Sequence, residues 1–155
     1  MMIGADQAVD FDRLDDELRR APALAPELFR KVIERGGARL LLLRQAGKAV
    51  RIDRLVEAGA WTDAAFALID LELPAWKLRR LFYEDGEWHC ALSRQPNLPV
   101  AFDDSVGASH EALPLAVVRA FVEARRRSST VSATISAVPQ VQPAPDQMIC
   151  CDNFA

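Results

Sequence analysis

The sequence is poor in the residues that build disulfide-stabilised or metal-stabilised domains. Its 155 residues include only three cysteines, Cys90, Cys150 and Cys151, and two histidines. An odd number of cysteines, two of them adjacent, is not a disulfide framework, and no Cys-x-x-Cys pair is present to begin a zinc site. We therefore expect no disulfide, no metal and no cofactor, and a reducing compartment. The sequence leaves the role of Cys150 and Cys151 open.

Long apolar runs and an excess of one charge are also missing. No run approaches the roughly 20 apolar residues that span a bilayer, and the four leucines at 40–43 are closed by arginine on both sides. The net charge is -3, whereas proteins held by nucleic acid or anionic membranes usually carry a basic excess. Residues 1–10 lack the basic start and apolar stretch of a secretory signal. We expect a soluble, cytoplasmic protein that does not bind a membrane.

The common catalytic motifs are absent as well. There is no glycine-rich phosphate loop and no G-x-S-x-G, and the sequence after His110 places Pro114 where a zinc-protease helix needs its second histidine. His89 and Cys90 are neighbours in an expected strand, where adjacent side chains point to opposite faces, so they cannot act as a pair. We expect no catalytic residue. An enzyme with a site around His89 stays as an alternative that requires a pocket and a nearby carboxylate.

The residues that are present favour one compact α+β domain over residues 1–127. Half of the chain is hydrophobic, which is enough to bury a core without covalent help. Residues 1–50 are expected to be mainly helical, although the apolar run within 38–50 favours helix only slightly over strand. Helical spacing of apolar residues, with proline or glycine terminators, predicts four helices, at 10–20, 26–36, 52–58 and 62–73.

A β-hairpin is the strongest local signal in the sequence. Two runs rich in aromatic and aliphatic residues, 76–84 and 87–94, flank Asp85-Gly86, a dipeptide suited to a two-residue turn. The turn sets a register in which Tyr83 faces Trp88, Leu81 faces Cys90 and Arg79 faces Leu92. Because successive side chains of a strand point to opposite faces, the hairpin is predicted to have a core face and an outer face. The core face holds Leu81, Tyr83, Trp88, Cys90 and Leu92, and the outer face holds Leu78, Arg80, Phe82, His89, Ala91 and Ser93.

The last third of the chain predicts further elements around the hairpin. Residues 100–102 are a candidate third strand and 103–107 a turn. An amphipathic helix that begins near 109–113 and ends with the arginines at 125–127 is expected to pack against the hairpin. The composition then changes to Ser, Thr, Val, Ala, Gln and Pro, so we expect residues 128–155 to form a flexible, disordered tail.

A resemblance to other proteins is found in two stretches of this sequence, ELPAWKLRRLFYEDGEWHCALS and ASHEALPLAVVRAFVEARRR. They resemble a group of small uncharacterised proteins from rhizobia and other alphaproteobacteria, over roughly residues 54–127. The resemblance implies a bacterial, cytoplasmic protein. It brings no activity, cofactor or catalytic residue that could be carried over.

These observations favour a non-catalytic protein-binding or adaptor module. The expected partner is another protein or a second copy of the chain, and the outer face of the hairpin is the candidate surface, with Arg80, Phe82 and His89 as its binding residues.

Nucleic-acid association is the alternative of a different class. Basic residues beside aromatic ones suit phosphate contact and base stacking, but three acidic residues share the segment and the basic excess is weak. Its candidate residues are Lys77, Arg79, Arg80 and Arg94.

Overall fold

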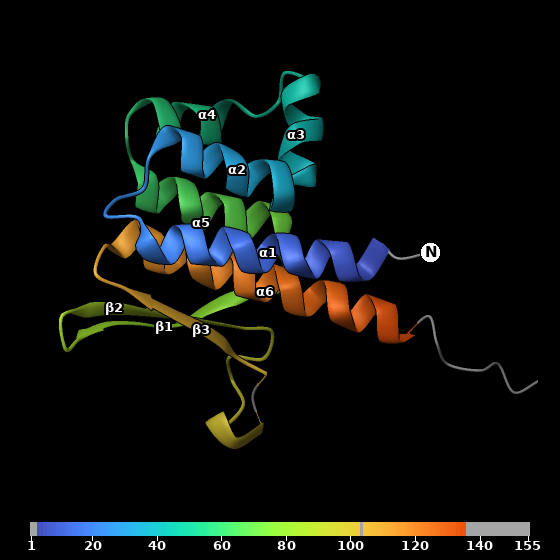
Figure 1. Ribbon diagram of the computed structural model, residues 1–155, viewed down its shortest axis with the longest axis vertical. Coiled ribbons are helices and arrows are strands. Elements are labelled where there is room, and N and C mark those ends of the chain that lie inside the picture. The colour runs from blue at the N-terminus through green and yellow to red at the C-terminus, as the bar shows by residue number, and fades with distance from the viewer. Residues whose placement is uncertain (1–2, 103, 136–155) are drawn as a thin grey trace, which may run out of the picture.

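The computed structural model describes residues 3–102 and 104–135 of the chain. These residues form six α-helices, one 3-10 helix and a three-stranded antiparallel sheet, so the expected α+β class is confirmed. Figure 1 shows α6 lying between the sheet and the other helices, with α1 beside it. The elements in chain order are α1 (Ile3–Arg20), α2 (Pro26–Gly36), α3 (Ala38–Gln45), α4 (Val50–Glu57), α5 (Trp61–Glu72), β1 (Lys77–Glu84), β2 (Glu87–Ser93), the 3-10 helix (Val100–Phe102), β3 (Val106–His110) and α6 (Leu113–Ile135).

The helices of the first half follow the apolar periodicity of the sequence. α2 occupies the expected residues, with Pro26 in its first turn. α1 begins earlier than expected, at Ile3, and buries Phe11, Leu14 and Leu18. In the ambiguous stretch 38–50, residues 38–45 are helical as α3, a short loop follows at 46–49, and α4 begins at Val50.

α6 is the central helix of the fold. Apolar side chains that point in several directions are buried along it, which is the pattern of a helix enclosed by other elements. The sheet packs on one side of α6 through β2 and β3, and α1, α2 and α5 pack on others, so the expected contact between the last helix and the hairpin is confirmed. Its buried residues are Leu115, Ala116, Val117, Val118, Ala120, Phe121, Val122 and Ala124.

α6 also extends past the arginines at 125–127, where we expected the tail to begin. The hydroxyls of Ser128, Ser129 and Thr130 donate hydrogen bonds to the backbone carbonyls four residues earlier, at 2.9 to 3.1 Å. The Trp76 indole N–H in turn donates to Ser128 Oγ at 3.1 Å. α6 therefore includes residues 128–135, which we expected to belong to the tail, and the Trp76 contact ties this part of the helix to the residue before β1. The remaining tail, 136–155, lies outside the described residues.

The hairpin turn and the register next to it are confirmed. Tyr83 lies opposite Trp88 and Leu81 lies opposite Cys90. Asp85 and Gly86 have φ angles of 52° and 85°, the left-handed values that a two-residue hairpin turn of this type requires.

Farther from the turn the predicted register is wrong. Leu78 lies opposite Leu92, and Arg79 is an extra residue in a bulge between Leu78 and Arg80. The Arg79 guanidinium donates to the backbone carbonyls of Pro96 and Leu98, each at 2.9 Å. A contact with a loop about 17 residues away leaves no local signal in strand alternation, so the bulge could not be anticipated.

The third strand exists, but not at the expected residues. Val100–Phe102 is a 3-10 helix, because the Phe102 N–H donates to the Pro99 carbonyl at 2.9 Å. β3 follows at Val106–His110, across the end of the expected turn and the expected start of the last helix, and pairs antiparallel with β2. The sheet order is therefore β1-β2-β3.

A buried glutamate joins the end of α5 to the start of α3. The Glu72 carboxylate accepts hydrogen bonds from the backbone N–H groups of Leu40, at 2.7 Å, and Arg39, at 3.3 Å. Its side chain is 0% exposed, and Arg125 Nη2 lies 3.9 Å from it. α3 has no side-chain cap of its own, so Glu72 satisfies N–H groups that its first turn leaves free.

Replacing this carboxylate tests its importance. We expect Glu72→Ala to lower the free energy of unfolding by about 2 to 4 kcal/mol, because buried N–H groups and Arg125 lose their partner. Urea denaturation followed by circular dichroism measures the change. Asp70→Ala, at an exposed position of the same helix, is the matched control and should cost less than about 0.5 kcal/mol. Equal effects of the two substitutions would contradict this assignment.

Candidate functional site

The sheet extends beyond the helix that covers it. α6 packs closely against β3 and β2, whereas β1 makes its main contacts with β2. On the face toward α6, Cys90 of β2 is 1% exposed. On the same face of β1, Leu81 is half-buried and Tyr83 is 59% exposed. β1 is therefore an edge strand whose residues 82–84, next to the turn, are exposed on both faces, and the expectation that Tyr83 belongs to the core is wrong.

The three expected binding residues lie together on the outer face. Phe82 and His89 are opposite each other in the register, and their rings stack with centroids 4.9 Å apart and planes 14° from parallel. Phe82 is 41% exposed, and Arg80, two residues before it, is also exposed. The α-helices lie on the opposite side of the sheet, whereas the 3-10 helix lies on the outer side (Figure 1). The outer face thus carries a stacked aromatic pair next to an arginine.

The four candidate nucleic-acid contacts are not equally available. Arg79 is held by the loop carbonyls described above. Arg94 pairs with Asp104 at 2.5 Å, and its guanidinium lies 5.2 Å from the ring centroid of Trp76. Lys77 and Arg80 are exposed. Arg79 and Arg94 are therefore engaged in contacts within the chain, so the four cations do not form one exposed basic surface.

The structure separates His89 from Cys90 as alternation predicts. Cys90 is buried beneath α6, and burial raises the pKa of its thiol to about 11. His89 lies on the other face against Phe82. Among the described residues, none forms a hydrogen bond or ion pair with the His89 ring nitrogens. The arrangement provides neither an activated thiol nor an oriented imidazole.

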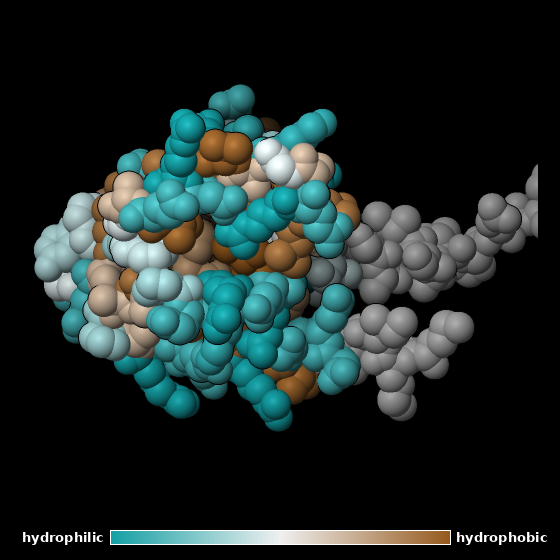
Figure 2. All heavy atoms as spheres, turned by 90° about the horizontal axis from the view of Figure 1, so that it is seen from above, coloured by the Kyte–Doolittle hydropathy of each residue, from teal (hydrophilic) through white to brown (hydrophobic). Residues whose placement is uncertain are grey.

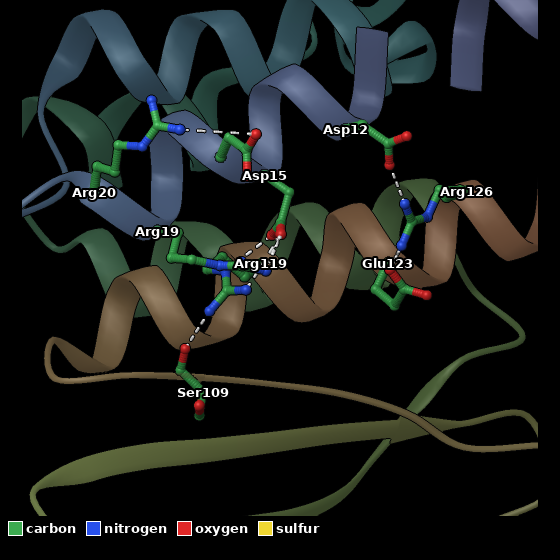
Figure 3. A network of polar contacts seen from close by, with 9 residues as sticks. Asp12, Asp15, Arg19, Arg20, Ser109, Arg119, Glu123 and Arg126 are labelled. Atoms are coloured by element: carbon green, nitrogen blue, oxygen red, sulfur yellow. Dashed lines mark hydrogen bonds and ion pairs between the residues drawn. The ribbon is translucent and has the colours of Figure 1, made fainter. Parts of the chain in front are cut away.

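Sequence reasoning did not anticipate a polar hollow at the end of α1. Its volume is about 580 Å³. Arg119 donates to Asp15 at 2.8 and 3.2 Å and to the Ser109 carbonyl, which links α6 to α1 and β3 (Figure 3). His110 Nδ1 accepts the N–H of Ala112 at 2.9 Å, where the chain enters α6. The hollow is lined by Arg19, Arg20, Ala21, Pro22, Glu87, Ser109, His110, Glu111 and Arg119. Its most buried polar groups thus hold the fold together.

A second hollow lies between α3, α4 and α5. It has a volume of about 300 Å³ and is largely apolar. Figure 2 looks onto this helical end of the molecule and shows apolar side chains between polar ones. The lining residues are Leu40, Leu43, Lys48, Ala49, Arg51, Ile52, Ala67, Asp70 and Leu71. The ionisable residues among them are Lys48, Arg51 and Asp70.

Neither a metal site nor a membrane helix is found in residues 3–102 and 104–135. No three side chains of His, Cys, Asp or Glu gather there in a way that could hold a metal ion. None of the helices there is both long enough and apolar enough to cross a bilayer. Comparison with known proteins finds no matching family model, curated protein or solved structure.

The burial of Cys90 predicts a thiol that does not react in the folded protein. In a variant with Cys150→Ser and Cys151→Ser, we expect native Cys90 to react with iodoacetamide at pH 8 at least about a hundredfold more slowly than in urea, because the thiolate is scarce and covered. Mass spectrometry of timed samples measures the labelling. Equal rates in the native and unfolded states would show that α6 does not cover the thiol.

Proposed function

We propose that this protein is a non-catalytic protein-binding module that uses the open β1 edge together with the outer-face residues Arg80, Phe82 and His89. The observation that carries the proposal is that β1 extends past α6. An edge strand presents unpaired backbone N–H and C=O groups, and an extended segment of a partner can add to them as another strand.

The side chains of β1 fit this use. Phe82 is 41% exposed on one face and Tyr83 is 59% exposed on the other. Edge strands are commonly protected by bulges, prolines or lysines. The bulge of β1 lies at Arg79, and residues 80–84 contain no proline and no lysine. Charged side chains also guard edge strands, and here they stand only at the two ends, as Arg80 and Glu84. The exposed aromatic side chains between them are typical of a binding edge.

The two alternative functions receive less support from the geometry. Nucleic-acid binding would need Arg79 and Arg94 to leave contacts within their own chain. Catalysis at His89 would need a carboxylate that orients its ring, and no carboxylate of the described residues forms a hydrogen bond or ion pair with His89. Neither alternative makes use of the open edge of β1.

A photocrosslinker at position 82 tests the proposed surface. We expect Phe82→p-benzoylphenylalanine, expressed in the native cell and irradiated, to form one discrete adduct that mass spectrometry assigns to a protein. The same replacement at Leu42, which is 65% exposed on α3 far from the sheet, should not form it. An absence of adducts at position 82, or the same adduct at position 42, would contradict the proposal.

A further inference from the structure

We infer that the partner of this edge is a second copy of the chain, paired antiparallel along β1 with Phe82 opposite Phe82 of the second copy. The inference rests on the proposed function and names its partner. It places a two-fold axis perpendicular to the sheet, so that both copies keep their helices on the same side.

The order of residues in β1 is self-complementary about Phe82. The stretch reads Arg80, Leu81, Phe82, Tyr83, Glu84. Antiparallel pairing about its centre sets Arg80 opposite Glu84 of the second copy and Leu81 opposite Tyr83, each twice by symmetry. Directly opposite residues point to the same face, so the charges meet on the outer face and the apolar pair meets on the helical face.

The backbone N–H and C=O groups on the free edge of β1 also fit the pairing centred on Phe82. In an antiparallel ladder, residues alternate between directing their N–H and C=O groups to one neighbouring strand and to the other. Glu84 and Glu87 flank the two-residue turn and pair with each other, so Glu84, Phe82 and Arg80 direct these groups to β2. Leu81 and Tyr83 then direct theirs to the free edge. Pairing about Phe82 brings these groups together between the two copies.

The neighbouring registers are less favourable. Pairing centred on Arg80 sets this arginine against its own copy, and like charges directly opposite are destabilising. Pairing centred on Leu81 sets Arg80 opposite Phe82 and includes the bulged Arg79. Only the register about Phe82 neutralises both charges and avoids the bulge.

The single chain leaves a charge imbalance that a second copy would correct. Glu84 lies opposite Glu87 across the hairpin, an unfavourable pair of like charges. Among the described residues, no cation forms an ion pair with Glu84 and no acid forms one with Arg80. Arg80 of the second copy would supply the missing positive charge beside Glu84.

The aromatic side chains would also continue across the axis. His89 stacks on Phe82 in each copy, so the pairing forms a row of four rings on the outer face. On the helical face, Tyr83 already packs against Trp88, with centroids 5.3 Å apart, and Leu81 of the second copy would cover it. The two three-stranded sheets would become one continuous sheet without an open edge at β1.

A charge exchange at the two ends of this stretch tests the register. Five paired residues make a small interface, so we expect a dissociation constant on the order of tens of micromolar for the unmodified chain. Sedimentation equilibrium of the purified protein measures it. Arg80→Glu and Glu84→Arg should each weaken self-association by about tenfold or more, because each variant sets two pairs of like charges opposite each other. Arg54→Glu, at an exposed position on α4, is the control and should leave it unchanged.

An equimolar mixture of the two single variants tests most sharply whether residue 80 of one copy pairs with residue 84 of the other. One variant then offers two glutamates and the other two arginines, so the mixture should form a heterodimer about as tightly as the unmodified chain. The double variant Arg80→Glu with Glu84→Arg should also recover self-association. Circular dichroism melts of each variant show that loss of association is not loss of folding.

Two results would overturn the inference. One is an unmodified chain that remains monomeric up to about 1 mM, far above the expected dissociation constant. The other is self-association that the single variants do not weaken or that their mixture does not recover. If the chain is monomeric while the crosslinker at Phe82 captures a different protein, the inference fails and the proposed function stands. If no adduct forms either, both fail.

Discussion

The fold depends on the burial of α6 between the sheet and the other helices. An α-helix is about 10 Å wide with its side chains, and neighbouring strands are about 4.8 Å apart, so one helix covers about two strands. α6 covers β2 and β3, where Cys90 and Leu92 are buried. β1 is left beyond the edge of the helix, so Tyr83 on its helical face is 59% exposed. The geometry of one helix on three strands thus creates the open edge.

A few buried polar contacts fix how the layers meet. Arg119, on α6, holds Asp15 of α1 and the Ser109 carbonyl of β3, while Glu72 satisfies backbone N–H groups at the start of α3. Apolar packing is not directional, whereas each of these groups would be costly to bury without its particular partner. These contacts therefore select one arrangement of α1, α6 and β3, and of α3 and α5.

Local patterns in the sequence predicted much of the fold and part of the site. Apolar periodicity located the helices, and Asp85-Gly86 set the register of Tyr83 with Trp88, because both signals act over a few residues. The bulge at Arg79, the position of β3 and the extension of α6 depend on contacts with distant segments, which such patterns do not encode. Alternation placed Arg80, Phe82 and His89 on one face. It assigned Tyr83 to the core because it cannot show how many strands a helix covers.

Amide hydrogen exchange followed by NMR in dilute solution measures directly whether the β1 edge is open in the single chain. The N–H groups of Arg80, Phe82 and Glu84 are expected to bond to β2, and those of Leu81 and Tyr83 to face solvent. If the edge is open, the Leu81 and Tyr83 amides exchange at least about a hundredfold faster than the Phe82 amide. Equal protection of all three amides at high dilution would contradict it.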